Sequence, residues 1–222
     1  LKVSIVEAFN SNEARRAGFT GQKSGVSDNN RIVERHRALL GYYWSSYDSG
    51  GNQERQNFFK FPLGPKVKGI DPRFAFDHDG GDFIFSLPNR LQGYMLAKAN
   101  GERLDAGPQN IVTDPNQFGG SYDILNGISC MGCHKHGIIP FQDSIRDIFK
   151  NKSDDVAEKV RQIYPPNEEF KDQVQDDQSA FLAALESACG KLMRGPDEKN
   201  RDIRSFPDPI TVIAKKYDAV LS

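Results

Sequence analysis

The chain has 222 residues, which is the length of one globular domain or of two small ones. Its 29 basic and 30 acidic residues give a formal charge of −1, so the composition indicates neither a nucleic-acid-binding protein nor a membrane-surface protein. Hydrophobic residues make up 37%, which is enough for a folded core, while no run of about 18 apolar residues predicts a transmembrane helix.

The beginning of the chain is expected to combine a short strand with one long helix. Alternating apolar and polar residues predict a strand over 1–7, followed by a polar, glycine-rich loop over 8–30. A helix is expected over 31–47, because residues 27–30 offer N-caps and apolar side chains recur on one stripe. That stripe consists of Ile32, Val33, His36, Leu39, Leu40 and Tyr43.

The next part of the chain is expected to hold an irregular segment and a β-hairpin. Five phenylalanines within 52–80 are expected to enter the core from loops: Phe58, Phe59, Phe61, Phe74 and Phe76. Strands are expected over 82–87 and 91–97, joined by a turn at Pro88-Asn89. Asn100-Gly101 predicts another turn, and 110–113 a third strand.

Helical periodicity dominates from residue 121 onward. Helices are expected over 141–150, 154–164, 168–193 and 209–221. The expected fold class is therefore α+β, in a single unit spanning 1–222. Its strand-containing N-terminal half, 1–120, has one long helix, and its mainly helical C-terminal half, 121–222, carries the cysteine motif described next.

The cluster with the most specific chemical meaning is Cys130-Met131-Gly132-Cys133-His134, a C-x-x-C-H motif. This pattern is typical of covalent haem attachment, in which two thiols add across two vinyl groups and the next residue presents an imidazole to the iron. The spacing matters because both thioether bonds and the Fe–N bond must close on one rigid macrocycle. The sequence therefore predicts one haem c held by Cys130 and Cys133, with His134 as the proximal iron ligand.

Three alternatives for the motif stay open. A thioredoxin-like redox dithiol needs a strand before it and a helix that begins at the first cysteine, whereas loop-like residues 126–129 precede Cys130. A zinc site would use Cys130, Cys133, His134 and His136, but four ligands within seven residues give poor tetrahedral geometry. The last alternative is a chance occurrence in a cysteine-poor chain.

Haem attachment also predicts a compartment, because thioether formation takes place outside the bacterial cytoplasm. We expect a periplasmic or extracellular protein. The chain begins at Leu1 and shows no signal segment, so we expect a processed or excised chain whose precursor carries an export signal upstream. The odd cysteine, Cys189, is expected to be a small apolar residue on a helix, with an intermolecular disulfide as the alternative.

Three segments of the sequence resemble a family of monohaem c-type cytochrome domains found in exported bacterial proteins of mostly unassigned function. They are residues 25–36, with the pattern GVSDNNR followed by ERH, residues 79–94, from DGGD to LQGY, and residues 126–134, NGISCMGCH. The resemblance spans roughly residues 17–217. It implies one covalent haem and no particular reaction. The chain resembles the small soluble cytochromes c less, since those have a helix just before the motif.

The ligand on the other side of the iron has several candidates. His36 is favoured because it lies on the apolar stripe of the expected helix, where a buried imidazole needs a partner. Met193 is the alternative, at the end of a helix 59 residues after His134, and Met95 on an expected strand is the weakest. His78 is expected in a charged turn, and His136 is too close in sequence to His134 to reach the opposite face.

The distal ligand separates the possible functions. Two strong protein ligands favour electron transfer, whereas an open site permits peroxide, nitric oxide or carbon monoxide chemistry. The favoured function is a monohaem c-type cytochrome that relays single electrons, that is, an electron-transfer protein, and whether the chain is also an enzyme stays open. The alternatives are a haem enzyme of peroxidase or nitrogen-oxide type, and a haem-bearing sensory or interaction module. Expected partners are redox proteins or subunits of an electron-transfer assembly, for which the acidic stretch 153–178 is either a docking patch or a solvated helix face.

Overall fold

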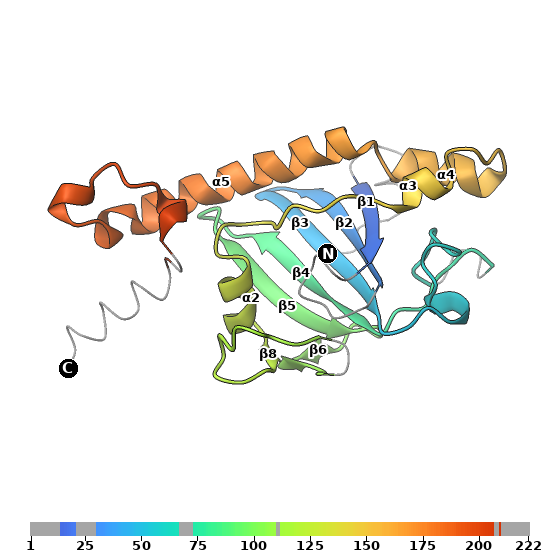
Figure 1. The fold of residues 1–222 in the computed structure, drawn as a ribbon, viewed down its shortest axis with the longest axis horizontal. Helices are drawn as coiled ribbons and strands as arrows, with labels where there is room; N and C mark the ends of the chain where they lie inside the picture. Colours follow the sequence, from blue (N-terminus) through green and yellow to red (C-terminus); the bar gives the residue numbers. More distant parts are fainter. Residues whose placement is uncertain (1–13, 21–29, 67–72, 110–111, 207–208, 210–222) are drawn as a thin grey trace.

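Six strands form one antiparallel sheet in which each strand pairs with the next along the chain, as Figure 1 shows. The strands are β1 (Ala14–Thr20), β2 (Asn30–Ala38), β3 (Gly41–Ser49), β4 (Gly80–Ser86), β5 (Gln92–Lys98) and β6 (Arg103–Leu104). A second, two-stranded sheet pairs β7 (Ala106–Gly107) with β8 (Ile124–Leu125). The computed structural model describes residues 14–20, 30–66, 73–109, 112–206 and 209.

The helix expected over 31–47 is wrong, because these residues form the hairpin β2–β3, which turns at Leu39-Leu40. The segment is rich in β-branched and aromatic residues, which favour strands. Its strand character is hard to recognise from the sequence because both faces of β2 are covered, so that Arg31, Glu34 and Ile32 are all shielded from solvent. A strand buried on both faces loses the alternation of apolar and polar residues that marks a half-exposed strand.

The expectation of a mainly helical C-terminal half is also wrong. Within its described residues there is one long helix, α5 (Asn167–Met193), with the short helices α2 (Ile128–Cys133), α3 (Ile145–Ile148) and α4 (Asp155–Ile163). Single 3-10 turns lie at η2 (Glu54–Gln56), η3 (Pro196–Glu198) and η4 (Ile203–Ser205). The helix expected over 141–150 shrinks to α3, because Asp143 and Ser144 are held by hydrogen bonds to Asn167 and to the Gly18 carbonyl.

Several other expectations are confirmed. The hairpin over 82–97 is present as β4 and β5, and the helices expected over 154–164 and 168–193 correspond to α4 and α5. Of the five phenylalanines expected in the core, Phe58 and Phe76 are fully buried and Phe59 and Phe61 pack against them. The strand expected over 1–7 and the helix expected over 209–221 lie outside the described residues, as does the first half of the strand expected over 110–113.

The register of the sheet assigns each side chain to one of two faces. Partners across neighbouring strands share a face, and successive residues of a strand alternate between faces. We call the face that carries Trp44 and its partners Arg35, Ile84 and Tyr94 the cavity face. The other face, called the back face, carries the row formed by His36, Tyr43, Phe85 and Gly93.

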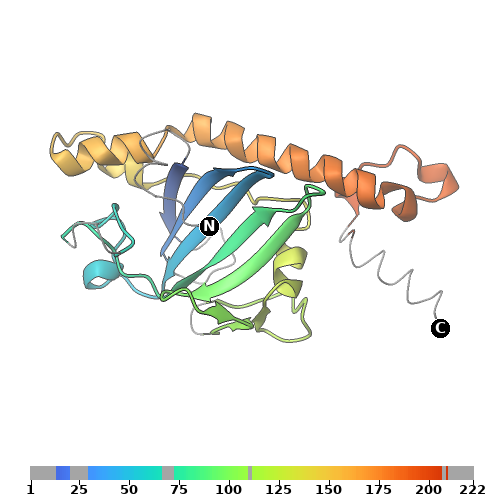
Figure 2. The same ribbon diagram turned by 180° about the vertical axis from the view of Figure 1, so that it is seen from behind.

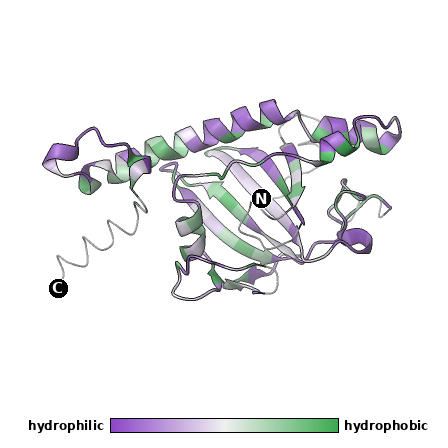
Figure 3. Ribbon diagram, in the orientation of Figure 1, coloured by the Kyte–Doolittle hydropathy of each residue, from purple (hydrophilic) through white to green (hydrophobic). Residues whose placement is uncertain are grey.

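Helix α5 runs along the top of the sheet in Figures 1 and 2 and is attached to the cavity face by aromatic packing. The Trp44 ring packs edge-on against Phe141 and Phe170, with centroids 5.9 and 5.6 Å away. The first half of α5 is mainly hydrophilic in Figure 3, whereas its second half is mainly hydrophobic. Of the eight acidic residues within 153–178, seven are exposed and only Asp177 is buried, as a solvated helix face requires.

Asp177 joins α5 to the sheet through three hydrogen bonds. Its carboxylate accepts from both Nε and one terminal nitrogen of Arg35, each at 2.7 Å, and from Trp44 Nε1 at 3.0 Å. Because Asp177 is 4% exposed, its removal would leave both donors without a partner in a nearly dry interface. These bonds therefore fix the position of α5 across β2 and β3.

We expect Asp177→Asn to lower the free energy of unfolding by about 3 kcal/mol, because it leaves the Arg35 charge uncompensated. Urea unfolding followed by tryptophan emission measures this, since Trp44 is the single tryptophan of the chain. The control is Asp176→Asn at the exposed neighbouring position, for which a change within about 0.5 kcal/mol is expected. Equal unfolding midpoints for the two variants would show that Asp177 does not hold the helix.

Candidate functional site

The two cysteines of the motif lie on the short helix α2, which follows β8 directly. The helix begins after Gly127, whose φ of +85° is a conformation that glycine adopts without strain. Ser129 fixes the start of the helix, because its hydroxyl accepts a hydrogen bond from the Leu125 amide at 3.1 Å. Cys130 and Cys133 are three positions apart and so lie on one side of α2, and both are free thiols.

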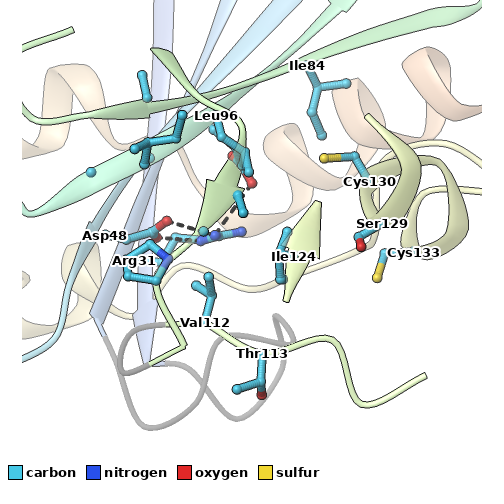
Figure 4. Close-up of a pocket in the computed structure, with 18 of the residues that line it drawn as sticks. Arg31, Asp48, Ile84, Leu96, Val112, Thr113, Ile124, Ser129, Cys130 and Cys133 are labelled. Carbon is cyan, nitrogen blue, oxygen red and sulfur yellow. Dashed lines mark hydrogen bonds and ion pairs between the residues drawn. The ribbon is translucent and has the colours of Figure 1, made fainter. Parts of the chain in front are cut away.

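A cavity of about 480 Å³ separates α2 from the cavity face of the sheet, and its size falls in the range of small-molecule and cofactor sites. Cys130, Cys133 and His134 line one side of it. In Figure 4 both sulfur atoms lie on the side of α2 that faces the cavity, with Arg31 and Asp48 across from them. Apolar side chains make up much of the remaining lining: Ile84, Leu96, Leu104, Val112, Ile124 and Ile139.

His134 is held as a neutral imidazole with a defined tautomer. Its Nδ1 lies 3.1 Å from the carbonyl oxygen of Gly137, so Nδ1 carries the proton and Nε2 keeps a free lone pair. Burial lowers the pKa of His134, against the opposing charge of Asp82, so the ring is neutral at pH 7. A histidine bonded in this way to a backbone carbonyl is oriented for metal ligation through Nε2.

The two thiols are protonated rather than activated. Burial raises the pKa of Cys130 to about 11 and also raises the pKa of Cys133. A redox-active dithiol needs the opposite shift, since the thiolate is the attacking species. Strand β8 precedes the motif and helix α2 contains it, in the order that a redox dithiol requires, but the raised pKa of both thiols does not favour that alternative.

The zinc alternative has no geometric support. In the part of the chain that the structure describes, no group of three or more histidine, cysteine, aspartate or glutamate side chains is arranged to hold a metal ion. His136, the fourth ligand of that hypothesis, does not line the cavity, and its Nε2 is buried without a hydrogen-bond partner.

A charged cluster on the sheet lies across the cavity from the cysteines, and no sequence motif predicts it. Arg31 donates to both carboxylate oxygens of Asp48, at 2.6 and 2.8 Å, and lies 3.5 Å from Asp82. Burial raises the pKa of Asp48, whereas Arg31 outweighs burial at Asp82 and lowers its pKa. The helix expected over 31–47 leaves Arg31 off its apolar stripe, so that expectation gives Arg31 no place at a buried site.

The segments that carry the family resemblance meet at this cavity. Arg31 ends the GVSDNNR pattern, residues 79–82 and Ile84 belong to the second segment, and Ser129 to His134 belong to the third. These segments are up to about 100 residues apart in sequence. Arg31 and Asp82 of the opposite wall lie in two of these segments, whereas Asp48 lies in none of them.

The structure does not bring the expected distal ligands to the cavity. His36 lies on the back face of the sheet, where its Nε2 is 3.1 Å from Glu34 Oε2 and its ring stacks on Tyr43 at 4.4 Å. Met95 lies on the same face, paired in register with Phe83. Met193 is buried at the end of α5 in a cluster with Leu185, Ile203 and Phe206.

His134 is in fact the one histidine or methionine of the chain that lines the cavity. The chain has four histidines and three methionines, and all seven lie within the described residues. His78 packs against Tyr47 and Phe76 outside the cavity lining, with ring centroids 5.1 and 6.2 Å away. The expectation that made His36 the favoured ligand depended on the helix over 31–47, which is not present.

Comparisons with protein-family models, curated proteins and solved structures found no match to this chain. The described residues contain no helix long and apolar enough to cross a membrane, in agreement with the hydropathy of the sequence.

Proposed function

We propose that this chain is a monohaem c-type cytochrome that binds haem covalently through Cys130 and Cys133, ligates its iron through His134 and relays single electrons. The observation that carries the proposal is that these three residues line one cavity of about 480 Å³. Adjacent positions in the sequence do not guarantee this. Helix α2 must present both sulfur atoms to the cavity, and His134, which follows the helix, must line the same cavity.

The state of the two cysteines suits thioether formation. Each thiol adds across one vinyl group, so that sulfur bonds to one vinyl carbon and the thiol hydrogen goes to the other. The addition consumes no oxidant or reductant, but it needs reduced cysteines, and Cys130 and Cys133 are both free. Gly132 lies between the two cysteines and packs against the Phe118 ring. A Cβ atom at position 132 would lie 2.3 Å from that ring, so the close approach of α2 to Phe118 needs a glycine here.

The remaining residues of the site support ligation and a controlled environment. The bond between His134 Nδ1 and the Gly137 carbonyl leaves Nε2 as the ligating atom and orients the ring. Haem supplies an iron that changes between ferrous and ferric states. The aliphatic lining would restrict water around a bound haem iron, and solvent exposure is one of the factors that set a reduction potential.

The same chemistry leads us to propose a periplasmic or extracellular location and redox-protein partners. Thioether formation outside the cytoplasm requires export of the chain. The seven exposed acidic residues along α4 and the first half of α5 give a negatively charged surface, which would attract a basic redox partner.

Haem staining after denaturing electrophoresis tests the proposal. The chain is produced in a bacterium with c-type maturation machinery, once with an export signal and once without it. We expect haem colour on the exported polypeptide alone, resistant to extraction with acidic organic solvent. Haem that extracts freely from the exported protein would refute covalent attachment, and equal attachment in the cytoplasm would refute the proposed location.

A further inference from the structure

We infer that the haem iron of this site keeps an open sixth position, where a neutral diatomic gas such as carbon monoxide or nitric oxide binds. The inference rests on the covalent haem and the His134 ligation of the proposed function, and it replaces the electron relay by gas binding as the task of that haem. Its first support is that no histidine or methionine other than His134 lines the cavity, although all seven such residues lie in the described parts of the chain. These two residue types supply the strong second ligand of electron-transfer cytochromes.

The strongest sequence candidates are kept away from the cavity by the sheet itself. His36 and Met95 project from the back face, so the backbone of β2 to β5 separates them from His134. A strand presents a side chain to the other face only if its register slips by one residue, which would move every neighbour in the strand as well. Met193 is held in a separate apolar cluster by Leu185, Ile203 and Phe206.

The weaker ligands in the described lining already have other partners. Asp48 and Asp82 pair with Arg31. Asp79 accepts hydrogen bonds from the Gly50 amide at 2.8 Å and from Gln56 Nε2 at 3.0 Å. Lys98 pairs with Glu102 at 3.0 Å.

The character of the cavity selects the class of exogenous ligand. Its aliphatic lining accommodates a small apolar molecule without loss of hydrogen bonds, whereas a buried anion needs a compensating charge. The described lining carries three aspartates, Asp48, Asp79 and Asp82, against the two cations Arg31 and Lys98. Arg31 is paired with Asp48 and Lys98 with Glu102, so both cations of the described lining already have acidic partners.

Absorption spectra of the haem-loaded protein, reduced with dithionite and titrated with carbon monoxide, test the inference. We expect a high-spin ferrous spectrum that converts completely to a low-spin adduct, with saturation at one carbon monoxide per haem. The ferric protein should in turn show high-spin signals in electron paramagnetic resonance. A low-spin ferrous spectrum that carbon monoxide leaves unchanged would overturn the inference, while covalent haem staining would still stand.

Single substitutions test whether one of the chain's own side chains is the sixth ligand of the iron. His36→Ala, Met95→Ala and Met193→Ala should leave the carbon monoxide titration as in the unsubstituted protein, because none of the three lines the cavity. If one of them, or Lys98→Ala, converts a closed low-spin iron into one that binds carbon monoxide, that residue is the sixth ligand and the open site is refuted. The titration of the unsubstituted protein decides the question even if a variant fails to fold.

Discussion

We expect the double variant Cys130→Ala, Cys133→Ala to carry no covalently bound haem, because both thioether bonds need these sulfur atoms. Haem staining of the purified polypeptide should fall to background, a loss of the whole signal rather than a fraction of it. Either single variant should keep one thioether bond and one unreacted vinyl group. The pyridine haemochrome spectrum of a single variant should therefore shift to longer wavelength, since a remaining vinyl group extends the conjugation of the ring.

The matched control is Cys189→Ala. Cys189 lies on α5 and packs against the cluster of Phe181, Leu185 and Met193, away from the cavity. This variant should stain as strongly as the unsubstituted protein. Retention of haem colour by the double variant, or its loss in Cys189→Ala, would contradict the attachment site. Circular dichroism of each variant separates the loss of haem from the loss of fold.

The largest expected loss of stability follows from removing Glu34 on the back face. Glu34 is fully buried, at 0% exposure, and its carboxylate forms hydrogen bonds with the Arg16 guanidinium and, at 2.9 Å, with the Tyr47 hydroxyl. His36 Nε2 lies 3.1 Å from the same carboxylate. Arg16 is itself 1% exposed, and its remaining nitrogen donates to the Pro62 carbonyl at 2.9 Å.

We expect Glu34→Gln to lower the free energy of unfolding by about 3–5 kcal/mol, because it removes the buried carboxylate charge that pairs with the Arg16 guanidinium. Urea unfolding at pH 7 measures the change. The matched control is Glu169→Gln, which breaks the partly exposed ion pair of Arg15 and Glu169, and about 0.5 kcal/mol or less is expected there. Similar losses in the two variants would show that the buried ion pair of Glu34 and Arg16 contributes no more to the free energy of unfolding than the partly exposed pair of Arg15 and Glu169.

The stabilisation by Glu34 should also depend on pH. Burial alone would raise the pKa of Glu34, but Arg16 and His36 outweigh it and lower the pKa from 4.5 to about 2. The contribution of Glu34 to the unfolding free energy is therefore fully present above pH 4.5 and is lost as the pH falls from 4.5 toward 2. Between these two pH values the unfolded chain binds a proton at Glu34 that the folded chain does not bind. The difference in unfolding free energy between the unsubstituted protein and Glu34→Gln should narrow from pH 6 to pH 3. A constant difference would show that folding does not lower the pKa of Glu34.

The sequence predicted some elements of the fold well and others wrongly, for identifiable reasons. Helix α4 has a clear start signal, since the Asp154 side chain accepts from the Ala157 amide at 2.8 Å. The hairpin of β4 and β5 has a turn sequence and short apolar runs. The hairpin of β2 and β3 lacks a glycine-rich two-residue turn, because Leu39-Leu40 forms its turn. It also lacks a solvent-exposed polar face, because both faces of β2 are covered.

The motif at residues 130–134 was sufficient to predict the three residues that line one side of the cavity, because the chemistry depends on local spacing alone. The opposite wall was not predictable in this way. Arg31, Asp48 and Asp82 come from three different strands, and their association depends on the register of the sheet. The position of His36 away from the cavity was unpredictable for the same reason, because the face that carries it follows from strand register and not from its neighbours in the sequence.

By itself, the sequence of this protein determined the C-x-x-C-H motif and the helices with local signals, because those depend on residues a few positions apart. Only the tertiary structure decided that β2 is a strand covered on both faces, that His36 bonds with Glu34 rather than facing His134, and that a cavity lies between α2 and the sheet. These features arise from long-range pairing, in which burial of each face outweighs the local helical pattern of 31–47. Secondary structure is a weak local preference, and the contacts that override it join residues far apart in the chain.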